Sequence, residues 1–217
     1  MLPQPTGAWH VGRTTFDWVD SSRAAFLDPS ESTRREILVD VWYPTRETAG
    51  GATYLPLMSA FSVTMSDSVA RRRYAPEYAA AVSGTLRTHA TQDATPSCAK
   101  SGCPLLTFSH GGGVDRSLYT AQYEELASHG YIVAAIAHTG STHRVVFSDG
   151  RSATAQVPPP VPERPEWQSL SALRRDFARD EAAAEYRRKV LVIEAADIRF
   201  VLDQFARIAK SPTSPFA

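Results

Sequence analysis

Long apolar runs, an excess of charge of one sign and cysteines beyond a single pair are all missing from this 217-residue sequence. No segment approaches the ~20 consecutive apolar residues that a membrane-spanning helix needs. Lysine plus arginine and aspartate plus glutamate both number 23, so the formal net charge is zero. A neutral chain has no overall basic field with which to hold nucleic acid or an anionic membrane surface. We therefore expect neither a nucleic-acid partner nor a membrane span.

The two cysteines, Cys98 and Cys103, bracket four residues of an expected loop. In an oxidising compartment such a pair can close a small disulfide, and two free surface thiols fit the sequence equally well. The sequence alone therefore leaves the state of this pair open.

Apolar patterns predict four strands of a sheet. Thr14–Val19 and Ile37–Tyr43 are predicted as antiparallel strands, with the polar, turn-rich segment Ser21–Arg35 connecting them. Leu105–Ser109 (LLTFS) and Tyr131–Ala137 (YIVAAIA) are nearly continuous apolar runs, which are typical of parallel strands buried on both faces. One face of the second strand is predicted from an alternating apolar set: Ile37, Val39, Val41 and Tyr43. We therefore expect a mixed, mostly parallel sheet.

Helices and an irregular insertion are predicted around these strands. Residues 45–103 lose the apolar periodicity and are predicted as an insertion beside a site, with one helix over Pro76–Leu86. A helix over Ser117–Ser128, ended by Gly130, would join the two continuous apolar strands into a βαβ unit. Residues 1–217 are then expected to form a single α/β domain.

A hairpin and a long helix are predicted in the last third of the chain. Val145–Phe147 and Ala153–Val157 flank the turn Ser148-Asp149-Gly150. The Ala-, Glu- and Arg-rich segment Leu170–Lys210 is predicted as a helix that packs on the sheet. The apolar residues at helical spacing in this segment are Leu191, Ile198, Val201, Leu202, Phe205 and Ile208.

The most specific chemical motif is Phe108–Gly113 (FSHGGG), which lies between a predicted buried strand and a predicted helix. In that context an HGGG-type loop supplies an oxyanion hole. Glycines let backbone N–H groups approach a negatively charged oxygen, because no side chain intervenes and φ is unrestricted. We expect the N–H of Gly112 to be the donor. Gly111 and Gly113 would shape the turn, and His110 would brace the loop.

The motif that would carry a serine nucleophile is missing. An α/β-hydrolase places this serine in a G-x-S-x-G turn between a strand and a helix, followed along the chain by an acid and a histidine. The candidate serines lack glycines at that spacing: Ser109, Ser117, Ser141 and Ser211. We therefore expect the serine, acid and histidine of a triad to lie beyond Ala217.

Three histidines near predicted strand ends, His110, His138 and His143, raise the alternative of a zinc site. Their spacing matches no short ligand motif, and a histidine directly after a buried strand commonly hydrogen-bonds a neighbouring loop. Asp197 and Asp203 are six residues apart on the last predicted helix, so they do not share a face as paired carboxylates would. We expect neither a metal nor another cofactor.

Two segments carry most of a resemblance to a known family: FSHGGG followed by Leu118-Tyr119, and Leu126–His138 (LASHGYIVAAIAH). The other matching segments are Pro5-Thr6-Gly7, Val11-Gly12, the VWYPT that ends at Thr45, Leu86–Asp93 (LRTHATQD) and Asp197–Phe205 (DIRFVLDQF). In this order they resemble the bacterial branch of the platelet-activating factor acetylhydrolase family, which lies near the cutinase-like polyester hydrolases.

This resemblance implies the N-terminal portion of an α/β-hydrolase fold, incomplete without downstream strands. It also implies a carboxylic ester hydrolase that acts on short or oxidised acyl lipids or on small esters, without a cofactor. The family's oxyanion donor follows its His-Gly pair, which here is Gly112. Val114, Leu118 and Tyr119 are expected to line one wall of the substrate pocket.

The sequence leaves open both the cellular location and the functional class of the protein. Met1–Gly12 lacks the basic start and apolar run of a signal peptide, whereas members of the family often begin with an export signal. Location therefore stays open, with a secreted or periplasmic protein favoured. The alternative function is a noncatalytic binding or interaction module, or an inactive fragment, in which the glycine loop only binds an anion.

The strand Leu105–Ser109 would lie at a sheet edge if the strand carrying the nucleophile is missing. An apolar edge exposes unpaired N–H and C=O groups and promotes association. We predict that residues 1–217 alone aggregate, dimerise or require a C-terminal half, and that they do not hydrolyse p-nitrophenyl acetate.

Overall fold

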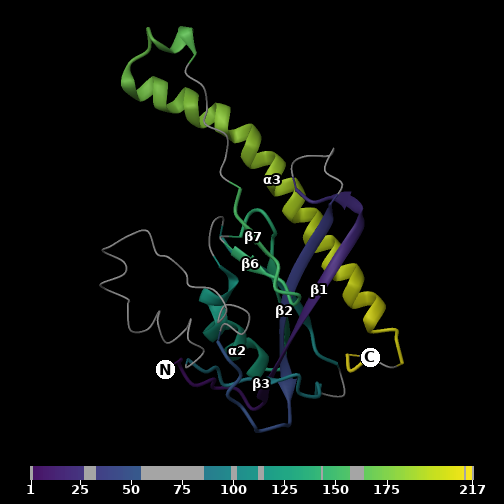
Figure 1. Cartoon of the computed structure of the whole chain (residues 1–217). Coiled ribbons are helices and arrows are strands. Elements are labelled where there is room, and N and C mark those ends of the chain that lie inside the picture. Colours follow the sequence, from purple (N-terminus) through teal and green to yellow (C-terminus); the bar gives the residue numbers. More distant parts are fainter. Residues whose placement is uncertain are drawn as a thin grey trace.

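A mixed β-sheet with a helix on each face forms the centre of the molecule (Figure 1). The computed structural model describes residues 2–26, 33–54, 86–98, 102–111, 115–142, 144–156, 164–212 and 214–216. Its elements are β1 (His10–Ala24), β2 (Arg34–Thr45), β3 (Thr91–Gln92), β4 (Leu105–Ser109), η1 (Arg116–Tyr119), α2 (Thr120–Ser128), β5 (Ile132–Ala137), β6 (Arg144–Val146), β7 (Ser152–Thr154), η2 (Pro165–Trp167) and α3 (Ala172–Ile208). Five strands form the main sheet in the order β3-β1-β2-β5-β4.

The first two strands form the antiparallel pair that was predicted, and both are longer than their apolar patterns indicated. The segment predicted as the connection, Ser21–Arg35, instead lies partly in strands, because β1 extends to Ala24 and β2 begins at Arg34. The polar residues tolerate strand backbone here because they have partners. Asp20 accepts hydrogen bonds from the backbone N and the hydroxyl of Ser22, and Arg35 is paired with a carboxylate of α3.

Strands β4 and β5 form the predicted parallel βαβ unit with α2. The connection enters the helix through the short 3-10 turn η1, where the Asp115 side chain accepts a hydrogen bond from the backbone N of Ser117 at 2.8 Å. It leaves the helix through Gly130, whose φ of +100° lies in the left-handed region that glycine adopts readily. On its other side β5 pairs antiparallel with β2, so the sheet is mixed.

Successive side chains of β2 and β5 point to opposite faces of the sheet, so each face carries its own apolar layer. The face toward α3 holds the predicted alternating set of β2, packed with Val201 and Phe205 of the helix. The opposite face holds Trp42 and Val133, packed with Tyr123 and Ala127 of α2. Burying each large apolar side chain contributes roughly 1.5–3 kcal/mol, so these two layers hold both helices on the sheet.

The long helix α3 only partly follows its predicted role. Val201 and Phe205 are buried against the sheet as expected, but Leu191 and Leu202 are 61% and 44% exposed. Figure 1 shows that the first part of α3 continues past the end of the sheet and the last part lies along it. Leu202 lies in that last part but follows buried Val201 and is itself exposed, so only one side of the helix meets the sheet there. A regular apolar spacing therefore overestimated how much of this helix the sheet covers.

The predicted hairpin is present, since β6 and β7 pair antiparallel around a turn in which Gly150 has a φ of +87°. Its second strand is shorter than predicted: β7 ends at Thr154, and Val157 lies outside the described residues. Val145 and Phe147 of this hairpin pack on Leu38 and Ala137 at the end of the main sheet. In the part of the chain that the structure describes, no helix is both long and apolar enough to cross a membrane.

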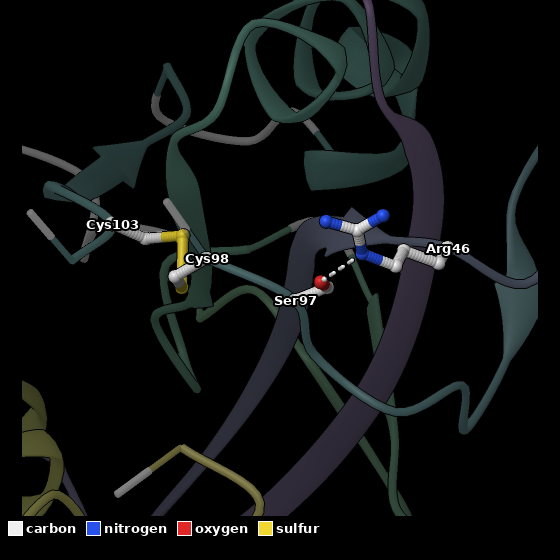
Figure 2. Close-up of a disulfide and its surroundings, with 4 residues drawn as sticks. All are labelled: Arg46, Ser97, Cys98 and Cys103. Carbon is white, nitrogen blue, oxygen red and sulfur yellow. Dashed lines mark hydrogen bonds between the residues drawn. A yellow bond between two sulfur atoms is a disulfide. The ribbon is translucent and has the colours of Figure 1, made fainter. Parts of the chain in front are cut away.

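The described flanks of the predicted insertion, residues 45–54 and 86–98, are attached to the sheet. Strand β3 pairs with β1, and the backbone N of Ser97 donates to the Pro44 carbonyl at 2.8 Å. Cys98 and Cys103 form a disulfide just before β4, which decides the question that the sequence left open (Figure 2). The predicted helix Pro76–Leu86 lies outside the described residues except for Leu86, which is not helical.

Candidate active site

The glycine loop follows β4 at its carboxyl end, where a parallel sheet commonly binds its ligands. The first two residues of the loop are described: His110 is buried and Gly111 is exposed. Gly112, Gly113 and Val114 lie outside the described residues. The role of Gly112 as the oxyanion donor therefore stays a prediction, and the described geometry concerns what holds the two ends of the loop.

His110 contacts both the loop and the turn after β5. Its Nδ1 lies 2.8 Å from the Gly111 carbonyl oxygen and its Nε2 lies 2.6 Å from the Thr142 hydroxyl. Because a carbonyl only accepts, Nδ1 carries the proton, and Nε2 then accepts from Thr142. Burial lowers the pKa of His110 more than its hydrogen bond to Gly111 raises it, so the ring is neutral near pH 7. These contacts attach His110 to the turn after β5, and its bracing role stays a prediction.

Ser109, the last residue of β4, begins a second chain of contacts that crosses the sheet. Its hydroxyl lies 3.0 Å from Nε2 of His138, and Nδ1 of His138 lies 2.9 Å from Oδ2 of Asp197 on α3. Ser109 is exposed, whereas His138 and Asp197 are completely buried. The sequence of groups, hydroxyl to imidazole to carboxylate, is that of a serine hydrolase triad.

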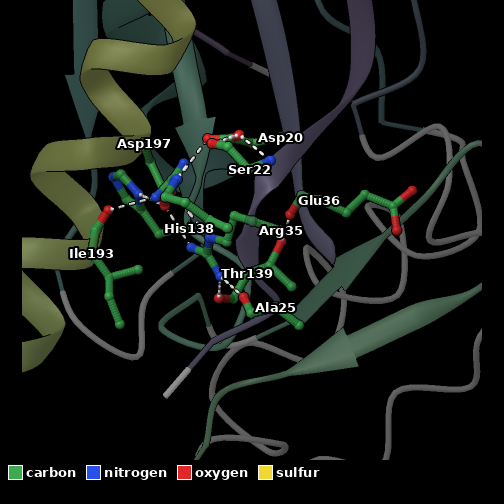
Figure 3. A network of polar contacts seen from close by, with 10 residues as sticks. Asp20, Ser22, Ala25, Arg35, Glu36, His138, Thr139, Ile193 and Asp197 are labelled. Carbon is green, nitrogen blue, oxygen red and sulfur yellow. Dashed lines mark hydrogen bonds and ion pairs between the residues drawn. The ribbon is translucent and has the colours of Figure 1, made fainter. Parts of the chain in front are cut away.

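Two arginines share the carboxylate at the buried end of this chain (Figure 3). Arg35 donates from Nε to Oδ1 at 3.0 Å and from Nη2 to Oδ2 at 2.5 Å, and Arg23 donates from Nη1 to Oδ1 at 2.9 Å. Burial raises the pKa of Asp197, but the hydrogen bonds from His138 and Arg35 and the charge of Arg35 outweigh it and lower the pKa to about 2. Asp197 is therefore ionised throughout the physiological range.

The described residues that follow the glycine loop contact a different buried carboxylate. Arg116 donates from Nε to Asp40 at 2.8 Å, and Arg13 lies 3.1 Å from the same carboxylate oxygen. Desolvation raises the pKa of Asp40, whereas Arg116, Arg13 and the Thr15 hydroxyl lower it to about 2 overall. His110 before the undescribed glycines and Arg116 after them are thus both tied to the rest of the fold.

The predicted substrate contacts fall on the first turn after the loop. Leu118 is 69% exposed, and the ring of Tyr119 packs on Phe108 with centroids 4.8 Å apart. Val114 lies outside the described residues. The contact of these residues with a substrate stays a prediction.

The three histidines considered as metal ligands are only partly tested. The rings of His110 and His138 lie 5.8 Å apart, and each has hydrogen-bond partners of its own. His143 lies outside the described residues. Among the residues that are described, no group of three potential metal ligands comes together.

The contact between His138 and Asp197 is not predicted by the sequence patterns. His138 has the position of a local loop contact, and Asp197 shares no face of its helix with Asp203. One signal was present, because His138 ends one of the family-like segments and Asp197 begins another. Their contact across 59 positions of sequence depends on the tertiary packing of α3.

Comparison with known proteins gives the chain a family context. The family described as platelet-activating factor acetylhydrolase, isoform II, matches residues 1–210. A platelet-activating factor acetylhydrolase of Cavia porcellus is 63% identical over 35 residues, which cover 16% of this chain and 8% of that protein. One of Canis lupus familiaris is 49% identical over 51 residues, which cover 23% and 12%.

A solved structure extends the similarity to the fold. A ferulic acid esterase from Streptomyces cinnamoneus matches 98% of this chain with a TM-score of 0.61 and 30% sequence identity. The match covers 50% of the esterase, so the chain spans about half the length of that enzyme. The fold is that of the α/β-hydrolases, as predicted.

Proposed function

Because the chain belongs to the platelet-activating factor acetylhydrolase family, we propose that it supplies the oxyanion-binding half of a carboxylic ester hydrolase. The observation that carries this proposal is the position of the His110-Gly111 pair. It directly follows the carboxyl end of a parallel strand and precedes η1 and α2, the location where HGGG-type loops act. The similarity to a solved esterase over nearly the whole chain supports the same conclusion.

The proposed chemistry of this half is electrostatic. When an ester carbonyl is attacked, negative charge develops on its oxygen, and the N–H of Gly112 would donate to that oxygen. Such a donor is already in place before the reaction, and removing one costs roughly 3 kcal/mol of barrier. The anchors at His110 and Arg116 would keep the loop from relaxing away from the oxyanion.

The nucleophile, acid and histidine are proposed to come from residues outside 1–217. The sequence contains no G-x-S-x-G motif, and the matched esterase is twice as long as the match. We propose a substrate with a short or oxidised acyl chain, or a small ester, with Val114, Leu118 and Tyr119 along one wall. The mechanism needs no cofactor.

A second candidate arises from the Ser109–His138–Asp197 chain of contacts. Its distances of 3.0 and 2.9 Å would suit a nucleophile, a base and an orienting acid within this chain. Against it, His138 is completely buried and could not reach a leaving group to return its proton. The two candidates differ in where the covalent acyl group forms.

Two variants of one glycine test the proposed function. The assay protein is the longest native chain that contains residues 1–217, and the substrate is p-nitrophenyl acetate. Gly112→Pro removes the backbone donor and should lower kcat by roughly 100- to 1000-fold. Gly112→Ala keeps the N–H but adds a side chain, so it should lose less than Gly112→Pro and separates the loss of the donor from the effect of a side chain.

Two results would overturn the proposed function. One is an inactive wild-type protein, and the other is full activity in Gly112→Pro. Residues 1–217 alone should give only background hydrolysis. Robust turnover by this chain that disappears in Ser109→Ala would favour the second candidate.

A further inference from the structure

We propose that Ser109, His138 and Asp197 form a positioning relay, which fixes the start of the oxyanion loop from the far side of the sheet. The proposal rests on the proposed esterase function and extends it to three residues with no direct contact to the reacting atoms. The relay runs from α3, past the end of β5, to the last residue of β4.

The proton positions in the relay follow from its buried end. Asp197 is ionised and only accepts, so Nδ1 of His138 must donate to it. With a neutral ring, Nε2 is the acceptor and the Ser109 hydroxyl donates to it across 3.0 Å. In that tautomer the hydroxyl hydrogen of Ser109 points into the protein. Its oxygen presents only lone pairs to the loop side.

The Asp197 carboxylate fixes the orientation of the His138 ring. An ionised carboxylate has about four acceptor sites. Three are filled by guanidinium N–H groups from Arg35 and Arg23, and His138 fills the fourth. Turning the ring away would leave a buried acceptor and a buried N–H unpaired, which is unfavourable because neither group could bond to water instead. The orientation of His138 is thus set by α3 and β2 together.

The same arginine also fixes the backbone behind the relay. Arg35 donates from Nη1 to the carbonyls of Ala25, at 2.7 Å, and Thr139, at 2.5 Å (Figure 3). The turn continues with hydrogen bonds from the N–H groups of Ser141 and Thr142 to the His138 carbonyl. Since Thr142 is the residue that contacts the His110 ring, two consecutive residues at the start of the loop are held by one turn.

Burial and charge favour a fixed relay over a catalytic one. A catalytic histidine must carry a positive charge during turnover and must reach the leaving group. Here protonation of His138 would add a third cationic partner to a carboxylate already paired with two guanidinium groups, in a completely buried position. Ser109 therefore positions the loop and does not attack the substrate.

Three substitutions in the longest native chain separate these roles. Ser109→Ala removes the hydroxyl, and Ser109→Thr keeps one. His138→Asn retains a donor toward Asp197 and removes the acceptor for Ser109. The control is Ser128→Ala, which removes a completely buried hydroxyl that donates to Glu125 and accepts from Gly7 at the end of α2, away from the loop.

A positioning role predicts a specific kinetic pattern with p-nitrophenyl acetate. Ser109→Ala and His138→Asn should each lower kcat by roughly 10- to 100-fold with KM changed less than about twofold, because a displaced loop weakens transition-state binding. The double variant should lose no more than either single variant, since both break one contact. Ser109→Thr should restore most of kcat, and Ser128→Ala should leave it unchanged.

Several outcomes would overturn the relay. Unchanged kcat in Ser109→Ala would show that the contact does not matter, and additive losses in the double variant would show that the two residues act separately. Labelling of Ser109 by a fluorophosphonate, or a loss of roughly a millionfold in Ser109→Ala, would make it the nucleophile.

Amide hydrogen exchange tests the relay without using activity. At matched folded fractions, Ser109→Ala should speed exchange at the N–H groups of His110 and Gly111, and Ser128→Ala should not. If the wild-type protein proves inactive, the proposed function fails while this measurement still decides the relay. If the wild-type protein is active and exchange is unchanged, only the relay fails.

Discussion

Strands β4 and β5 pair side by side over five residues and have similar apolar sequences, yet their surroundings differ completely. Every residue of β5 is buried, because β2 and β4 flank it and a helix covers each face. No residue of β4 is fully buried, and within the described residues β4 has a neighbour on one side only. We call the β5 side of the sheet the closed side, because its strand is fully covered, and the β4 side the open side, because its strand has one described neighbour only. The proposed oxyanion loop follows the open strand.

The largest expected effect lies on the closed side. Asp197→Ala should lower the free energy of unfolding by about 3–5 kcal/mol, because it leaves two guanidinium groups and an imidazole without their buried acceptor. Asp149→Ala breaks an exposed ion pair with Arg151 and is the matched control, with a much smaller expected loss because solvent screens exposed pairs. Urea unfolding followed by circular dichroism measures both, and equal losses would contradict the contrast.

Cavity-forming substitutions compare the two strands directly. Ile136→Ala in β5 should cost about 2–5 kcal/mol, since its side chain is fully buried. Leu106→Ala in β4 should cost clearly less in residues 1–217, because that side chain is only half-buried. A comparable cost at both positions would mean that β4 is covered by part of the chain in solution.

Acid sensitivity should also come from the buried carboxylates near the closed side. The pKa values of Asp40 and Asp197 are lowered to about 2 from 3.8, so their stabilisation is complete above about pH 4 and is lost as the pH falls through about 2. Each should contribute about 2 kcal/mol over that range. Asp40→Asn should reduce the slope of unfolding free energy against pH there. An unchanged slope would contradict the assignment.

The smallest effect is expected from a charge on the open strand. Thr107→Lys in β4 should reduce self-association of residues 1–217, because charged side chains disfavour pairing between exposed sheet edges. Sedimentation velocity measures the change, with Ser152→Lys on β7 as the control. A wild-type fragment that is already a monomer would contradict the predicted association through β4.

Local patterns were enough to predict both of these strands, but not how much each is covered. LLTFS and YIVAAIA gave β4 and β5 within one residue, and Gly130 gave the end of α2. Burial depends on the neighbour that a strand meets, which its own sequence does not specify. The extent of β1 was underestimated because Asp20 and Arg23 are polar, and only the fold reveals their partners.

The residues of the candidate site also divide into those that the sequence could predict and those that depend on tertiary packing. FSHGGG predicted where the loop begins, and the structure shows the contacts of His110 while its role stays a prediction. Ser109, His138 and Asp197 could not be joined from sequence, because their contacts need α3 packed against the sheet. Motifs therefore located the proposed chemistry, whereas tertiary packing determined what supports it.

The central claim concerns the direction of a single N–H group. A crystal structure of the longest native chain with a phosphonate ester bound to its nucleophile would test it most directly. We predict that the Gly112 nitrogen lies about 2.7–3.1 Å from the phosphonyl oxygen. A Gly112 nitrogen that points away from that oxygen, or a phosphonate attached to Ser109, would contradict the account.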